Sequence, residues 1–238
     1  MSNPAVAVLE SALRAKKLDR TLTTALQLGK GEGAVASTGV AALDTVLHGG
    51  LPRGELSEIA GARSSGRTTL LLQFMAAATQ RGEIAALIDT SDRLDVASVI
   101  AAGVDPDGLL WVRGDASSPP DRAIERALKA LTLVLQSGGF SVAAIDLADA
   151  PPSALHRLPF TTWMRVQRMI EGSETACLIA GPHPIGRSAG GLSLTLDGAS
   201  RWTDAMDRLT GLDTVVRVVS PRRRVEGEVA VAATFTAP

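Results

Sequence analysis

The sequence contains no tyrosine and only four phenylalanines among its 238 residues, so an aromatic platform for stacking bases is not expected. Its single cysteine, Cys177, excludes an intrachain disulfide, which is typical of a reducing compartment. No run approaches the ~18 apolar residues of a membrane helix, and the first residues lack the basic leader and apolar core of a secretory signal. The formal net charge of -1 provides no global attraction for nucleic acid. We therefore expect a cytoplasmic globular protein without a membrane partner.

One glycine-rich stretch organises the chain. Residues 61–69 match the phosphate-loop pattern G-x-x-x-x-G-K-[ST], except that Arg67 stands where the lysine belongs. The apolar run 56–60 before it predicts a strand, and residues 70–79 after it predict a helix that ends near Gly82. A turn between a strand and a helix directs backbone N–H groups and a helix dipole at one anion. The predicted nucleotide-binding residues in this stretch are Gly61, Ser64, Ser65, Gly66, Arg67, Thr68 and Thr69.

Strands and helices alternate through the rest of the chain, which predicts an α/β fold with a mostly parallel sheet covered on both faces. The predicted strands 83–89 and 140–146 end in Asp89 and Asp146. In parallel sheets a ligand lies beyond the carboxyl ends of the strands, where we expect both aspartates to meet the phosphate loop. The other predicted elements are helices 93–102, 121–136 and 160–171, strands 109–112, 175–180 and 192–196, and an irregular loop 181–191.

Two terminal segments differ from this pattern. Residues 1–36 predict an amphipathic helix over 4–20 followed by a linker, and the body is predicted over 37–238. The body should end in an antiparallel hairpin, at about 197–238, because two alternating segments flank a basic tip. The N-terminal helix has two open placements, on its own domain or on a neighbouring molecule.

Several of these segments, in the same order and at similar spacing, resemble the RecA family of recombinases. They include Ser37-Thr-Gly39, Gly49-Gly-Leu-Pro52, Ser64-Ser-Gly-Arg-Thr-Thr-Leu70 and Ile88-Asp89, and the resemblance covers roughly residues 37–196. Within the family, Leu109-Leu-Trp-Val-Arg113, Leu158-Pro-Phe-Thr-Thr-Trp163 and Ser220-Pro-Arg-Arg-Arg224 look like the ImuA branch. The resemblance implies a RecA-like core and self-association through the N-terminal helix. It also implies an error-prone DNA polymerase or a RecA filament as a protein partner, with single-stranded DNA as a further candidate partner.

The site departs from the family pattern at three positions. Arg67 is planar and bulkier than the lysine that reaches the phosphates. Ser91 stands where the resemblance implies a water-activating glutamate, although neighbouring Asp92 is a candidate substitute for that base. Ala180-Gly181 replace an Asn-Gln pair that senses the γ-phosphate. Together these changes predict little or no ATP hydrolysis, so no cofactor is required.

ATP or ADP with magnesium could still bind weakly, with Thr68 and Asp146 as the metal-holding residues. An alternative role for Asp146 is to cap a turn at the end of its strand. The three histidines and Cys177 show no metal-ligand spacing, so no zinc site is predicted.

Three basic features are candidate DNA contacts, each with the alternative that it is a solvated surface. The first lies on the predicted helix 160–171, near His156 and Arg157, and the second is the loop 181–191, which also carries His183. The third is the tip of the hairpin. The candidate DNA-binding residues are Arg165, Arg168, Arg187, Arg222, Arg223 and Arg224.

The sequence leaves three functions open. The favoured one is a nucleoid-associated accessory protein in damage-induced translesion synthesis. The second is a DNA-dependent ATPase and recombinase in which Arg67 and Asp92 replace the usual lysine and glutamate. The third is a regulatory interaction protein, such as a cell-division inhibitor.

Overall fold

The computed structural model describes residues 34–186, 191–205, 208–220 and 225–235. The predicted N-terminal helix, Arg187 and the hairpin tip with Arg222, Arg223 and Arg224 lie outside the described residues. Within the described ranges no helix is long and apolar enough to cross a membrane.

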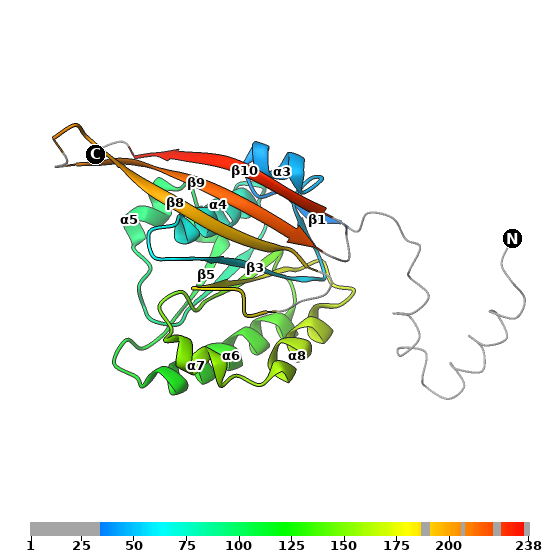
Figure 1. Ribbon diagram of the computed structural model, residues 1–238. Helices are drawn as coiled ribbons and strands as arrows, with labels where there is room; N and C mark the ends of the chain where they lie inside the picture. Colours follow the sequence, from blue (N-terminus) through cyan, green and yellow to red (C-terminus); the bar gives the residue numbers. More distant parts are fainter. Residues whose placement is uncertain (1–33, 187–190, 206–207, 221–224, 236–238) are drawn as a thin grey trace, which may run out of the picture. The chain divides into compact units, whose positions relative to one another are not determined.

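The fold is α/β and is built on one eight-stranded sheet, which confirms the predicted class (Figure 1). The strand order is β10-β9-β8-β3-β7-β6-β4-β5. All neighbouring pairs from β8 to β5 are parallel, while β9 pairs antiparallel with both β8 and β10. The strands are β3 (Leu56–Gly61), β4 (Ala85–Asp89), β5 (Leu109–Arg113), β6 (Val142–Asp146), β7 (Ala176–Gly181), β8 (Ser193–Trp202), β9 (Leu209–Ser220) and β10 (Val225–Thr234).

Helices cover both faces of this sheet, as the alternating pattern predicts. Figure 1 shows α3, α4 and α5 on one side and α6, α7 and α8 on the other. Their bounds are α3 (Ala41–Val46), α4 (Arg67–Gln80), α5 (Val96–Ala101), α6 (Pro120–Ser137), α7 (Pro152–His156) and α8 (Phe160–Ile170), with a short 3-10 turn η1 at Pro106–Gly108. Two separate apolar clusters result, one on each face of the sheet.

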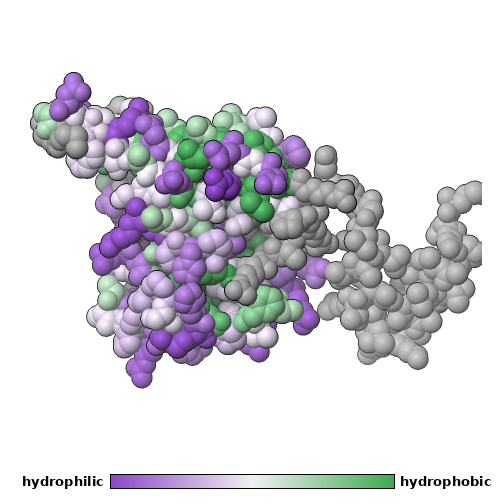
Figure 2. Space-filling model, in the orientation of Figure 1, coloured by the Kyte–Doolittle hydropathy of each residue, from purple (hydrophilic) through white to green (hydrophobic). Residues whose placement is uncertain are grey.

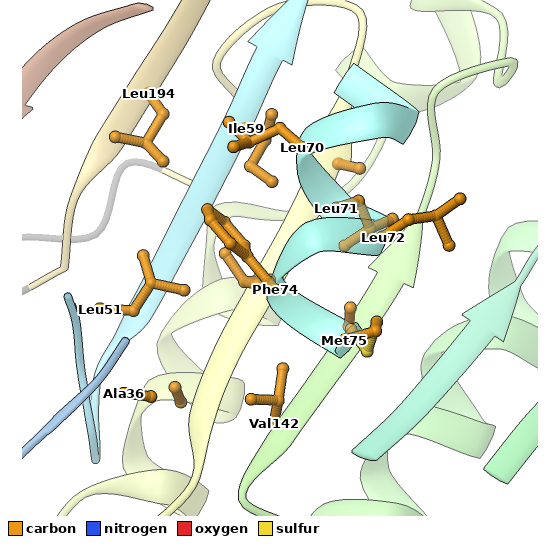
Figure 3. Close-up of a cluster of buried hydrophobic side chains, with 14 of the residues drawn as sticks. Ala36, Leu51, Ile59, Leu70, Leu71, Leu72, Phe74, Met75, Val142 and Leu194 are labelled. Carbon is orange, nitrogen blue, oxygen red and sulfur yellow. The ribbon is translucent and has the colours of Figure 1, made fainter. Parts of the chain in front are cut away.

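The cluster beneath α4 anchors the helix that follows the phosphate loop. Figure 3 shows Phe74 and Leu70 of α4 facing Ile59 of β3, and Phe74 and Ile59 are at most 1% exposed. Burying an apolar side chain of this size contributes roughly 1.5–3 kcal/mol. The start of α4 therefore has a fixed position relative to the end of β3.

Several boundaries differ from the prediction. Helix α5 begins at Val96 rather than at 93, because the Asp95 side chain caps it by accepting from Ser98 N at 2.8 Å. Strand β8 extends beyond residue 196 to Trp202, because β9 pairs with it over its whole length. The short helices α3 and α7 were not predicted. Two residues of the predicted linker form β1 (Val35–Ala36), which pairs with β2 (Leu51–Pro52).

Candidate functional site

The phosphate loop joins β3 to α4 as the sequence predicts. Gly66 caps the helix at φ 95° and Ser64 has φ 61°, so the loop turns through left-handed backbone positions. The amide of Leu70 donates to Gly66 O at 2.9 Å, which leaves the helix amides before it without a helical acceptor. These amides point out of the helix N-terminus, where an anion is stabilised.

Arg67 folds back against the protein. The residue as a whole is 7% exposed, and its Nη1 donates to the carbonyl of Ala148, just beyond β6, at 3.4 Å. Burial lowers its pKa, while the charges of Asp146 and Asp149 act in the opposite direction. The guanidinium thus lies between the loop and the carboxyl end of β6.

Asp146 lies at the end of β6, in register with Asp89 at the end of neighbouring β4. Its Oδ1 accepts from the amide of Ala148 at 2.8 Å, so the same residue holds both Asp146 and Arg67. Burial raises the pKa of Asp146 to about 6; the Ala148 hydrogen bond and Arg67 oppose this effect. A carboxyl group that is perturbed in this way is typical of functional sites, and its bond to Ala148 also fits the turn-capping alternative.

Asp89 is buried and organises the turn after β4. Its two oxygens accept from Arg93 N at 3.0 Å and Leu94 N at 2.8 Å, and Trp111 Nε1 donates to it at 3.3 Å. These bonds satisfy the carboxylate within the protein. Asp89 therefore lies at the expected edge of the sheet but acts locally as a cap.

Asp92 has a cationic partner. Its carboxylate accepts from Arg113 Nε at 2.8 Å and from Arg113 Nη2 at 2.9 Å, and the arginine lies over the Trp111 ring. The ion pair lowers the pKa of Asp92. A general base needs a pKa near the working pH, so this geometry does not favour Asp92 in that role.

Strand β9 covers the phosphate loop from the far end of the chain, a contact that was not predicted. Thr214 Oγ1 donates to the carbonyl of Ser65 at 3.2 Å. A Cβ placed on Gly66 would lie 2.8 Å from both Thr214 Oγ1 and Leu212 Cδ2, so this position requires glycine for close approach as well as for its φ angle. No local pattern in the sequence signals contacts between segments about 150 residues apart.

A groove and a smaller pocket border the phosphate loop. A groove of about 660 Å³ runs between the start of α4, α5 and the strands β9 and β10, with mostly apolar walls. A smaller pocket of about 210 Å³ lies directly on the loop. Its lining comes from the loop and helix start (Ser64, Gly66, Arg67, Thr68, Thr69) and from the ends of β8, β9 and β10 (Ser200, Leu209, Gly211, Leu212, Phe235).

Of the candidate DNA contacts, Arg165 and Arg168 lie exposed on α8, and neither has an ion-pair partner among the described residues. The start of the loop 181–191 is fixed by buried Glu58 of β3, whose Oε2 accepts from the amides of Ile185 and Gly186 at 2.8 and 2.7 Å. The loop therefore begins from a rigid position.

Two histidines meet in the structure although they are far apart in sequence. The rings of His156, at the end of α7, and His183 lie 5.3 Å apart between centroids. His183 Nε2 is buried without a partner in the described part of the chain. No group of three or more histidine, cysteine, aspartate or glutamate side chains is placed to hold a metal ion in the described ranges.

The remaining surface has both hydrophobic and hydrophilic regions. Figure 2 shows hydrophobic side chains gathered over β9, β10 and α3, whereas the surface over α6 and α7 is largely hydrophilic. On the outward face of β9, Val215 and Val219 are 38% and 40% exposed, with Arg217 between them.

The parallel sheet, the glycine-rich turn and the carboxylate at the end of β6 define the class of phosphate-loop α/β proteins. The sequence model of the RecA N-terminal domain matches residues 8–154. The chain belongs to the RecA family.

Named relatives agree with this assignment. The chain is similar to Protein RecA of Salinispora tropica (42% identical over 120 residues, 50% of this chain and 32% of the relative) and of Desulfotalea psychrophila (42% over 117 residues, 49% and 31%). It is also similar to Protein RecA of Clavibacter michiganensis (41% over 148 residues, 60% and 38%). The matches thus span about a third of the length of these relatives.

Proposed function

We propose that this chain is an accessory protein of damage-induced translesion synthesis, similar to ImuA, with little or no ATP hydrolysis. In this role it binds single-stranded DNA or a RecA filament and an error-prone DNA polymerase, in the cytoplasm and close to the nucleoid. Membership of the RecA family supports a role in DNA metabolism. The polymerase partner is inferred from the resemblance to the ImuA branch.

The observation that carries this proposal is the placement of Arg67. A phosphate-loop lysine reaches the β- and γ-phosphates of the nucleotide, whereas Arg67 is a buried residue whose guanidinium bonds to Ala148 O. No strong base lies at the expected position, because Ser91 cannot be one at neutral pH and Asp92 is engaged by Arg113. Losing a positioned base costs roughly 10²–10⁴-fold in rate.

DNA binding is supported by the exposed, unpaired Arg165 and Arg168 on α8. Arginines of this kind contact phosphates and so position a strand without reading its sequence. Arg187 and the residues 222–224 are further proposed contacts that lie outside the described residues.

A second candidate function is a DNA-dependent ATPase and recombinase. It is favoured by the relatives, which are named Protein RecA at 41–42% identity. In this alternative, Arg67 would have to take the role of the lysine that reaches both the β- and γ-phosphates. Asp92 would also have to be released from Arg113.

Steady-state ATP hydrolysis by the purified chain, with and without single-stranded DNA, separates the two candidates. We expect no turnover above that of a control in which Asp146 is replaced by alanine, together with salt-dependent binding of single-stranded DNA. Binding should weaken in the pair variant Arg165→Ala, Arg168→Ala but not in Arg81→Ala, a surface arginine at the far end of α4. DNA-stimulated turnover that disappears in the Asp146→Ala variant would establish the ATPase instead. Absence of any DNA binding at low salt would contradict the recombinase and would leave the accessory role only through binding to a RecA filament.

A further inference from the structure

The positive charge that the phosphate loop places near Asp146 belongs to the side chain of Arg67. Arg67 Nη1 bonds to Ala148 O, and Asp146 Oδ1 bonds to Ala148 N, so the guanidinium and the carboxylate are held by the two sides of one residue. In phosphate-loop enzymes a divalent metal ion occupies this neighbourhood, held by a loop hydroxyl and an acidic side chain.

Magnesium does not fit these residues. It requires near-ideal octahedral coordination by oxygens at 2.0–2.1 Å, whereas the buried Arg67 brings a positive charge and up to five N–H donors to the site. The charges of Asp146 and Asp149 already act on Arg67, and Asp149 also lies 3.7 Å from Arg63 Nη2. A divalent ion would compete with both arginines for the same carboxylates.

Arg67 also has donors without an acceptor among the described residues, and it lines a pocket. The residue as a whole is 7% exposed, yet only Nη1 has an acceptor among the described residues, and that bond is long at 3.4 Å. Arg67 lines the pocket of about 210 Å³ together with Ser64, Gly66, Thr68 and Thr69. A water molecule takes up roughly 30 Å³, so this volume holds about seven waters or a diphosphate group.

We propose that the loop 61–69 binds the diphosphate group of a phosphoanion without a divalent metal ion, and that Arg67 supplies the charge that magnesium provides in related sites. The backbone amides at the start of α4 cradle one phosphate. The free guanidinium donors of Arg67 bond to the other, since arginine binds phosphate oxygens through parallel N–H groups. Inorganic pyrophosphate and a nucleoside diphosphate share this chemistry.

Isothermal titration of the full-length chain with inorganic pyrophosphate and, separately, with ADP tests the proposal in magnesium chloride and in EDTA. We expect the dissociation constant to change by less than about twofold when magnesium is removed. Charge-assisted hydrogen bonds are worth roughly 1.5–3 kcal/mol, so Arg67→Ala should weaken binding by about tenfold or more. The matched control Arg81→Ala, at the C-cap of the same helix and outside the loop, should bind like the unmodified chain.

A lysine variant keeps the test decisive if Arg67→Ala fails to fold. In Arg67→Lys the shorter, single-point cation releases Ala148 and the carboxylate, so binding should become stronger with magnesium than with EDTA. Equal binding of pyrophosphate and ADP would show that the diphosphate alone is recognised, and tighter binding of ADP would show that the nucleoside contributes. Binding by the unmodified chain that requires magnesium would overturn the proposal, as would no binding of either ligand.

This inference rests on the altered phosphate loop of the proposed function, but the two can fail separately. A chain that binds neither ligand can still bind DNA without turnover, which would leave the accessory role intact. A chain that binds pyrophosphate in EDTA but not DNA would retain this inference and lose the DNA-binding part of the proposed role.

Discussion

Asp146 is kept in a site that disfavours its charge, so replacing it with the neutral isostere asparagine should stabilise the protein. Burial is the main cause of its raised pKa, and the nearby carboxylates of Asp89 and Asp149 add to it. Asparagine retains an oxygen that can accept from Ala148 N but has no charge to desolvate. We therefore predict that Asp146→Asn increases the free energy of unfolding at neutral pH.

The magnitude follows from the pKa. A rise from 3.8 to about 6 corresponds to about 3 kcal/mol at about 1.4 kcal/mol per pKa unit. Because the folded state takes up a proton at higher pH than the unfolded state, the destabilisation is absent below pH 3.8, grows as the pH rises to 6, and is complete above it. The expected gain from Asp146→Asn is thus up to about 3 kcal/mol at about pH 7.5 and about 1 kcal/mol at about pH 4.5.

Urea denaturation of both proteins at these two pH values measures the gain directly. The control is Asp149→Asn, three residues further along the same segment, where the carboxylate is partly exposed and lies 3.7 Å from Arg63. That substitution should change stability by less than about 1 kcal/mol, as is typical of exposed ion pairs. A loss of stability in Asp146→Asn at neutral pH, or an equal gain at both pH values, would refute the reasoning.

Two further predictions concern stability. Arg53 and Arg81 both form an ion pair with Glu83, at 2.9 and 2.8 Å. The Arg53 side chain is 13% exposed and also donates to three backbone carbonyls. The Arg81 side chain is 35% exposed. Arg53→Ala should therefore cost about 3–5 kcal/mol and Arg81→Ala less than about 1 kcal/mol in urea denaturation, and similar losses would contradict this account. Thr214→Val keeps the shape of the side chain but removes its bond to the Ser65 carbonyl, so we expect a loss of about 1–3 kcal/mol and faster hydrogen exchange of the loop amides; unchanged exchange would show that β9 does not hold the loop.

The local parts of the site could be predicted because their signals are local. The apolar run of β3, the glycine at the left-handed position of Gly66 and the apolar run of α4 follow each other within about 25 residues, and the structure has them where the pattern predicts. The two strand-end aspartates also lie at the predicted edge of the sheet. The length of an apolar run and the glycine that follows or precedes it can be read from the sequence itself.

The partners of the charged groups could not be predicted, because they depend on the packing of distant segments. Asp92 meets Arg113 only because β4 and β5 pair in register, and Arg67 meets Ala148 only because the loop after β6 lies beside the start of α4. Helix α5 begins at Val96 and not at the predicted residue 93 for a related reason. Asp89 holds the amides of Arg93 and Leu94 in the turn after β4, and the helix begins after Asp95, which caps it.

The shape of the phosphate loop does not depend on the groups that would make it an ATPase. Gly66 is fixed by its φ angle and by the contact with Thr214, and Ser65 is held through its carbonyl. The packing of α4 on β3 positions the loop from the other side. Since none of these contacts involves the side chain of Arg67 or of Ser91, the sequence can change at both positions and keep the loop. The chain therefore keeps the fold and the sequence pattern of its family, while the chemistry of the site has to be argued from the individual side chains.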